Sequence, residues 1–231
     1  MNIIGIETAT ERLGAALIMG EAVHERHVDS RSSHCELLTG FIADIVKEAG
    51  ITMNDIHGVS VSIGPGSFTG LRIGIATAMG LAYGLGIKTA GINTLSALAW
   101  NAADKGTLVC PLIDAKRSEV YTGIYRTGNS IPHPFVAPSA MSVDKLALKL
   151  LSLDEPVTIT GPAAEQFRDT IEKVVGSSTV FIAADKAKPS ALAIARFGQL
   201  MLRSGKGIHP SALQPVYLRR SDAEIARDSS G

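Results

Sequence analysis

Residues 68–85 form the segment that most limits how this chain can fold. They carry one charged side chain, Arg72, and are otherwise apolar or small on every side of a helix. A helix that is apolar all round is expected to be buried all round. The segment also contains four glycines, each costing about 1 kcal/mol relative to alanine inside a helix. We therefore expect a central helix against which other backbones pack very closely.

A glycine-rich turn, Gly64-Pro65-Gly66-Ser67, precedes this helix and follows an apolar strand. Backbone N–H groups in such a place can cradle a phosphate. A Walker A loop would need Lys and then Ser or Thr after its last glycine, but Leu71 and Arg72 stand there. A dinucleotide fingerprint would need G-x-G-x-x-G and a later acidic residue, and the sequence has neither. We expect a turn that lets two backbones approach closely, with a phosphate cradle as the alternative.

A second helix, expected at residues 34–48, also has a surplus of apolar side chains. They spread over roughly half of its circumference, which is wider than the usual stripe of about 100°. The surplus could cover a second layer of the same chain or a partner chain, and we expect the partner. Two such helices side by side predict a helix–helix interface. Its expected residues are Leu38, Phe41, Ile42, Ile45, Leu71, Arg72, Ile75 and Met79.

The remaining segments alternate strands and helices, which indicates an α/β fold. The chain opens with a predicted hairpin, whose strands lie at 3–6 and 13–19. Residues 126–156 contain four prolines and are expected to be irregular. Further strands are expected at 21–28, 56–63, 87–92 and 157–160, further helices at 94–103 and 191–203, and an extended tail at 215–219.

The second half of the chain repeats the opening pattern. Residues 111–115 align with residues 4–8, because in both an apolar strand ends in a carboxylate and a polar turn containing an arginine follows. Such a repeat predicts two similar lobes, each starting with a hairpin whose tip is acidic. We place the boundary between residues 1–103 and residues 104–231.

Charge and cysteine content limit the possible partners. Lys plus Arg and Asp plus Glu both total 22, so a net charge of zero argues against bulk capture of nucleic acid. A local contact with tRNA through Arg219, Arg220 and Arg227 stays open as an alternative to a solvated tail. Cys35 and Cys110 have no metal-site spacing and are expected to be buried thiols in a reducing compartment. The first residues lack an export pattern, and no membrane span is expected, so we predict a cytoplasmic protein.

Three motifs resemble the TsaB family, also called YeaZ. They are Glu7-Thr8-Ala9-Thr10, the helix start at residues 33–38, and GPGSFTGLRIG at residues 64–74. The resemblance extends to Pro215-Val216-Tyr217-Leu218-Arg219 and covers nearly the whole chain. It implies a two-lobed actin/sugar-kinase/Hsp70-like fold with duplicated mixed-sheet lobes, the second lobe being reduced.

The resemblance also implies a function. It points to the synthesis of N6-threonylcarbamoyladenosine at position 37 of tRNAs that read codons starting with A. The implied partners are a catalytic paralogue, TsaD, and an ATPase, TsaE. We expect a heterodimer with the TsaD-like protein, a homodimer when the chain is alone, and contact with tRNA only through the complex.

Departures from the catalytic paralogue argue against an enzyme. The two positions that would hold metal-binding histidines fall on Thr94 and Leu98, and a leucine offers no lone pair. His34 resembles one histidine of the paralogue but stands alone, and a zinc peptidase is disfavoured because no HExxH or paired-histidine motif occurs. We therefore expect no catalytic residues, no metal and no cofactor.

The opening hairpins could still keep a trace of a nucleotide site. In the implied fold, ATP lies between the lobes with Mg²⁺ near two hairpin carboxylates. Glu7, Thr8 and Asp114 are the candidate residues for vestigial phosphate or nucleotide binding. The alternative function is a sugar-kinase-like phosphotransferase or ATPase that uses Glu7 and Asp114.

Overall fold

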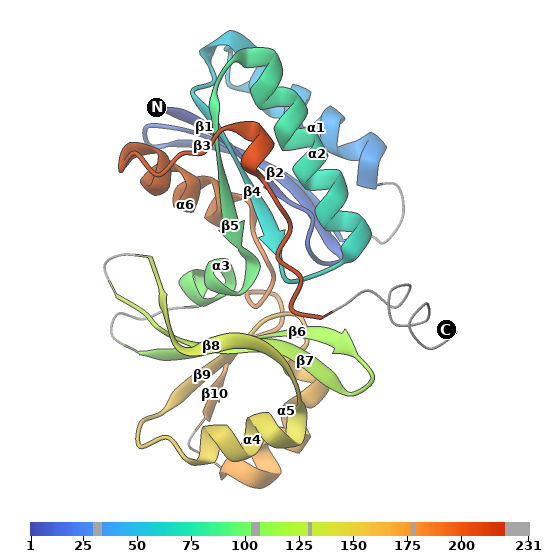
Figure 1. Ribbon diagram of the computed structural model, residues 1–231, viewed down its shortest axis with the longest axis vertical. Helices are drawn as coiled ribbons and strands as arrows, with labels where there is room; N and C mark the ends of the chain where they lie inside the picture. The colour runs from blue at the N-terminus through green and yellow to red at the C-terminus, as the bar shows by residue number, and fades with distance from the viewer. Residues whose placement is uncertain (30–33, 103–106, 129–130, 177–178, 220–231) are drawn as a thin grey trace.

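The structure, a computed structural model, describes residues 1–29, 34–102, 107–128, 131–176 and 179–219, and only the backbone of residues 34–36. The chain forms two lobes stacked along the long axis of the molecule (Figure 1). Each lobe is built around one five-stranded sheet.

The first sheet has the order β3-β2-β1-β4-β5. Strand β1 pairs antiparallel with β2 and parallel with β4. Alternate residues of β1 face opposite cores, Ile4 and Ile6 toward α1 and α2, and Ile3 toward α6. Cover on both faces explains why this strand is a continuous apolar run. The strands are β1 (Asn2–Glu7), β2 (Arg12–Met19), β3 (Ala22–Asp29), β4 (Gly58–Gly64) and β5 (Lys88–Asn93); the helices are α1 (His34–Glu48), α2 (Phe68–Leu85) and α6 (Ala191–Arg203), with a short 3-10 turn η1 (Met53–Asp55).

The second sheet repeats this order as β8-β7-β6-β9-β10, with the same parallel and antiparallel pairings. The predicted duplication and the two-lobed fold are thus confirmed. The lobe is reduced at one side of its sheet, where β9 and β10 have 4 and 3 residues against 7 and 6 in β4 and β5. Its elements are β6 (Leu108–Lys116), β7 (Glu119–Arg126), β8 (His133–Ser142), β9 (Val157–Thr160), β10 (Thr179–Phe181), α4 (Val143–Leu151) and α5 (Ala164–Val175).

The expectation that residues 126–156 are irregular is wrong. They contain the end of β7, strand β8 and helix α4. Two of the prolines, Pro134 and Pro138, lie in β8, which is the edge strand of its sheet. Proline is tolerated at a sheet edge because the missing N–H faces no neighbouring strand.

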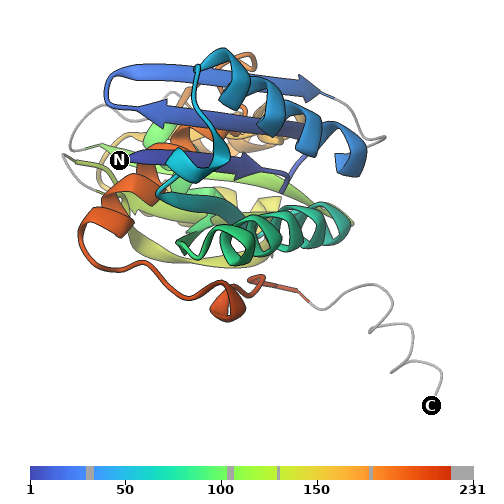
Figure 2. The same ribbon diagram turned by 90° about the horizontal axis from the view of Figure 1, so that it is seen from above.

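Two helices pack on a different lobe from the strand that precedes them in the sequence. Helix α3 (Thr94–Asn101) follows β5 but packs its Leu95 and Leu98 on the second sheet. Helix α6 lies on the first sheet, so closely that a Cβ at Gly5 would collide with the backbone of Ala191. The prediction that all of residues 104–231 belong to the second lobe is therefore wrong for α6 and for residues 208–216 (Figure 2).

Candidate partner surface and interlobe cleft

Helix α2 spans Phe68–Leu85, as predicted, and its inner face packs mainly on β4. The Ser67 side chain caps its start by accepting a hydrogen bond from the Gly70 N–H at 3.2 Å. A Cβ at Gly70 would collide with the carbonyl oxygen of Thr8, and a Cβ at Gly74 with the Thr8 hydroxyl. Close packing against another backbone, expected from the glycines, is thus confirmed at Gly70, whereas Gly74 packs closely against side chains.

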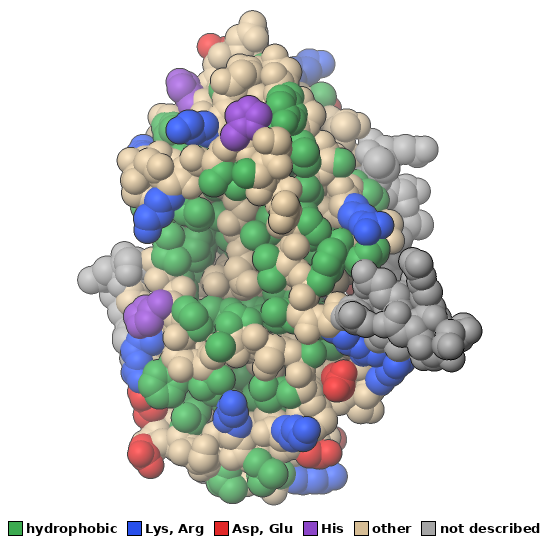
Figure 3. Space-filling model, viewed as in Figure 1, with side chains coloured by type: hydrophobic (Ala, Val, Ile, Leu, Met, Phe, Trp, Pro, Cys, Tyr) green, Lys and Arg blue, Asp and Glu red, His purple; other side chains and the backbone are tan. Residues whose placement is uncertain are grey.

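The outer face of α2 is exposed, so the expectation of burial on every side is wrong. Arg72, Ala76, Gly80 and Gly84 lie on this face, and Tyr83 is 51% exposed. A Cβ at Gly80 or Gly84 would meet nothing within 4 Å. The surface over α2 shows uncharged side chains around one basic group (Figure 3). By length and composition alone α2 could also cross a membrane, but here it packs on β4.

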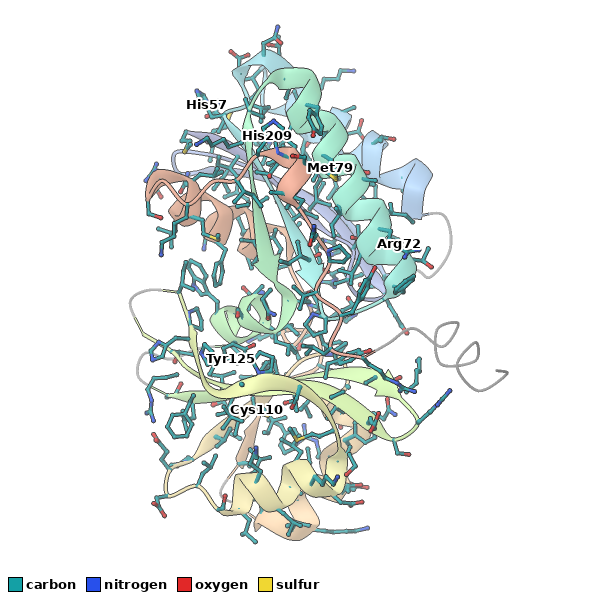
Figure 4. The ribbon with its side chains drawn as sticks, in the orientation of Figure 1. His57, Arg72, Met79, Cys110, Tyr125 and His209 are labelled. Atoms are coloured by element: carbon teal, nitrogen blue, oxygen red, sulfur yellow. The ribbon has the colours of Figure 1, made fainter. Side chains whose placement is uncertain are left out.

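Five of the eight predicted interface residues belong to the core of the lone chain. Leu38, Ile42, Ile45, Leu71 and Ile75 are at most 6% exposed, so their assignment to an exposed interface is wrong. The stripe with the strongest apolar periodicity faces the sheet, because that is where each helix buries most surface. Phe41 and Met79 are partly buried and Arg72 is exposed (Figure 4).

A shallow apolar groove runs between α1 and α2. Its volume is about 530 Å³. The exposed residues of α1 include the small or apolar Leu37, Gly40 and Ala43, with Leu37 37% exposed, and the charged Asp44, Lys47 and Glu48. The lining residues are Thr39, Ile42, Ala43, Val46, Lys47, Ile51, Met53 and Leu81. The groove and the outer face of α2 together are called here the α1/α2 surface, whose side chains are mostly small or apolar apart from Lys47 and Arg72.

Glu7 is the last residue of β1 and is buried beneath the start of α2. It is 0% exposed, and its Oε1 accepts a hydrogen bond from the Ala9 N–H at 2.6 Å. Within the described residues, Glu7 Oε2 and the Thr8 hydroxyl have no hydrogen-bond partner. Burial raises the pKa of the Glu7 carboxyl to about 7, although the hydrogen bonds from Ala9 and Ser62 oppose the shift.

Asp114 lies at the matching place in the second lobe, near the tip of the β6–β7 hairpin. Its carboxylate forms an ion pair with Lys116 at 2.7 Å and accepts a hydrogen bond from the Lys116 N–H at 2.8 Å. Asp114 lines the space between the lobes, whereas Glu7 and Thr8 do not. The two carboxylates therefore do not fit a shared Mg²⁺–nucleotide site.

The cleft between the lobes has a volume of about 1240 Å³. The first turn of α2 and the start of α5 both border it. On its wall Asp29 pairs with Arg12 at 2.8 Å and with Lys188 at 2.7 Å, and these hydrogen bonds hold the pKa of Asp29 well below its usual range. The side chains that border the cleft are thus of mixed charge and partly paired with one another.

The two positions expected to hold metal-binding histidines in the catalytic paralogue lie in helix α3. Thr94 and Leu98 are both buried, and no group of three His, Cys, Asp or Glu side chains that could hold a metal lies in the described part of the chain. Cys110 is buried beside Thr122, and burial raises its thiol pKa to about 12. The side chains of His34 and Cys35 lie outside the described residues.

Other histidines have structural contacts. The Nδ1 of His57 accepts a hydrogen bond from the Asn2 N–H at 3.1 Å. His209 caps the 3-10 turn η3 (Pro210–Ala212), and its ring meets the edge of Tyr83 at 5.4 Å between centroids. Figure 4 shows His209 beside α2 and far from Tyr125, which points from the second sheet toward α3.

The C-terminal tail contributes contacts that sequence reasoning missed. The Tyr217 ring stacks on Phe68 with centroids 4.7 Å apart, and Arg72 lies 3.9 Å from the centre of the same Phe68 ring. Arg219 donates a hydrogen bond to the Ala115 carbonyl oxygen at 3.0 Å. Arg220 and Arg227 lie outside the described residues. The sequence feature that could have indicated these contacts is the presence of Tyr217 and Arg219 in the predicted extended segment at 215–219.

Comparisons with known proteins agree on one group of relatives. The sequence matches the family model of tRNA N6-adenosine threonylcarbamoyltransferase, TsaD, over residues 27–227. It is 30% identical over 226 residues to the tRNA threonylcarbamoyladenosine biosynthesis protein TsaB of Escherichia coli, covering 96% of each chain. The protein of that name in Bacillus subtilis is 28% identical over 225 residues, covering 97% of this chain and 96% of the relative.

A solved structure supports the same fold. YeaZ from Pseudomonas aeruginosa superposes with a TM-score of 0.80 at 23% identity, covering 94% of this chain and 99% of that one. At this identity the likeness concerns the fold alone.

Proposed function

Because the chain belongs to the TsaB family of tRNA threonylcarbamoyladenosine biosynthesis proteins, we propose that it acts in that pathway as a non-catalytic partner subunit. It would support transfer of the threonylcarbamoyl group to N6 of adenosine 37 by a TsaD-like catalytic paralogue. A TsaE-like ATPase would act in the same complex. The tRNA would be contacted through the assembly, in the cytoplasm.

The observation that carries this proposal is the outer face of α2. Exposed Ala76, Gly80 and Gly84 let another backbone approach closely, and Tyr83 and Arg72 are residue types enriched at interfaces. A surface of this composition on a lone chain is a sign of a binding partner. The helix is charged only at Arg72, so the expected partner surface is apolar rather than strongly acidic.

A homologous protein suits this surface because it would present an equivalent pair of helices. Two α1/α2 surfaces can pack as a four-helix layer with their small residues in contact. With the paralogue, this gives a heterodimer. With a second copy of this chain, the same surface closes by two-fold symmetry into a homodimer.

The surroundings of the two candidate catalytic carboxylates, Glu7 and Asp114, support the non-catalytic role. Glu7 is sealed under α2, and Asp114 is paired with Lys116. The observation that favours the alternative function, a phosphotransferase or ATPase, is the size of the interlobe cleft. The alternative is tested by measuring ATP hydrolysis with Mg²⁺ in the parent chain and in Asp114→Asn. We expect the substitution to cause no loss of ATP hydrolysis.

The decisive experiment places a charge on the outer face of α2. Ala76→Glu should weaken binding to the TsaD-like subunit at least about tenfold, because an unpaired carboxylate would be buried in the complex. Val180→Glu, on an exposed apolar residue of β10, is the matched control and should bind normally. Binding is measured by calorimetry and tRNA modification by mass spectrometry. Full affinity of Ala76→Glu would refute the proposed surface.

A further inference from the structure

The C-terminal tail gives the two lobes a third connection. The chain passes to the second lobe between β5 and β6 and returns between β10 and α6. After η3 the tail runs down beside α2 and β5 and reaches the second lobe again (Figure 1). Two connections form a hinge, and a third attachment can restrict rotation about it.

On the first lobe, the tail is attached by backbone bonds and by packing. Ile208 exchanges two hydrogen bonds of 2.9 Å with Thr89, and the Val216 N–H donates to the Ile63 carbonyl oxygen at 2.7 Å. Leu213 is 5% exposed and belongs to the core of this lobe. The segment is thus fixed to β4 and β5 up to Val216.

The next residues cross to the second lobe. Tyr217 still stacks on Phe68 of α2. Leu218 packs against the cluster formed by α3, β6 and β7. Arg219 donates to the Ala115 carbonyl oxygen at 3.0 Å and lies 3.5 Å from a carboxylate oxygen of Glu119, with its side chain 16% exposed.

We propose that residues 213–219 are a strap that holds the opening of the interlobe cleft at a fixed width. Tyr217 and Arg219 both line that cleft, one attached to each lobe, and a single residue separates them. An extended residue spans at most about 3.5 Å, so the backbone between the two attachments is too short to follow a wide opening of the cleft. Rotation that widens the cleft must break either the Tyr217–Phe68 stack or the Arg219 contacts with the β6–β7 hairpin.

The strap is tested on the full chain by measuring a distance between the lobes. Spin labels are attached through Glu21→Cys on the first lobe and Ser152→Cys on the second, both exposed, with Cys35 and Cys110 replaced by alanine. Pulsed electron paramagnetic resonance should give one narrow distance distribution for the parent. Arg219→Ala and Tyr217→Ala should each broaden it toward longer distances.

Arg196→Ala, which removes an exposed arginine of α6 instead, should leave the distribution narrow. Should Arg219→Ala fail to fold, Tyr217→Ala decides, because Tyr217 is 41% exposed and its truncation leaves the cores intact. A narrow, unshifted distribution in every folded strap variant would overturn the proposal, as would equal broadening by Arg196→Ala. The measurement needs no partner subunit, so its failure would not bear on the proposed function.

Discussion

Glu7 is the residue whose surroundings differ most from its predicted place at an open hairpin tip. The prediction correctly places it at the end of the first strand, next to a polar turn. The start of α2 then closes over it, because Gly70 and Gly74 allow the helix to touch Thr8. A carboxyl group expected beside a nucleotide is thereby held in the core with one unpaired oxygen.

This burial makes stability depend on pH near neutrality. The pKa of Glu7 rises from 4.5 to about 7 on folding, so the folded state binds more protons between these values. Stability should therefore fall as pH rises through this window, by roughly 2–3 kcal/mol between pH 5 and pH 8. Glu7→Gln should remove this part of the slope, measured as urea midpoints across the range.

The exposed carboxylate variant Glu21→Gln serves as the control and should keep the parental pH slope. Asp29 does not interfere, because its lowered pKa affects stability only at more acidic pH. Identical slopes for Glu7→Gln and the parent would contradict the assigned burial effect.

At the scale of elements, helix α2 shows what the sequence could and could not predict. Its limits follow from Ser67 and Gly86, which cap its two ends. The exposure of its outer face could not be predicted from the sequence. Ala76 and Gly80 are small, so the pattern does not distinguish their outward face from the inward face that carries Ile75. The strand β8 was missed for a related reason, since Pro134 argues against a strand unless its edge position is known.

Two glycines of α2 provide a matched test of this description. Gly74→Ala should destabilise the chain by about 1–3 kcal/mol, because the new methyl group collides with the Thr8 side chain. Gly80→Ala meets open space in the lone chain and should stabilise it by up to about 1 kcal/mol through helix propensity. Thermal unfolding of both variants distinguishes them, and equal changes of the same sign would contradict the packing described.

For the whole molecule, the first lobe is discontinuous in sequence, because α6 returns to it after the second lobe. The duplicated strands could be recognised from local pattern, since Asp114 lies near the end of its strand and Glu7 is the last residue of its own. Which sheet a returning helix covers depends instead on contacts between residues far apart, such as Gly5 with Ala191. Local pattern carries no such information, and this is why the predicted boundary assigned α6 to the wrong lobe.

The arrangement predicts that the first lobe needs α6 in order to fold. Residues 1–93 alone would expose the face of the sheet that carries Ile3 and Ile92, which α6 buries. A fusion of residues 1–93 through a flexible linker to residues 189–216 should unfold cooperatively and give a dispersed NMR spectrum, whereas residues 1–93 alone should not. Ala195→Glu in the fusion should abolish folding, because Ala195 is 0% exposed against β1. Equally cooperative folding of residues 1–93 alone would show that the first lobe is continuous after all.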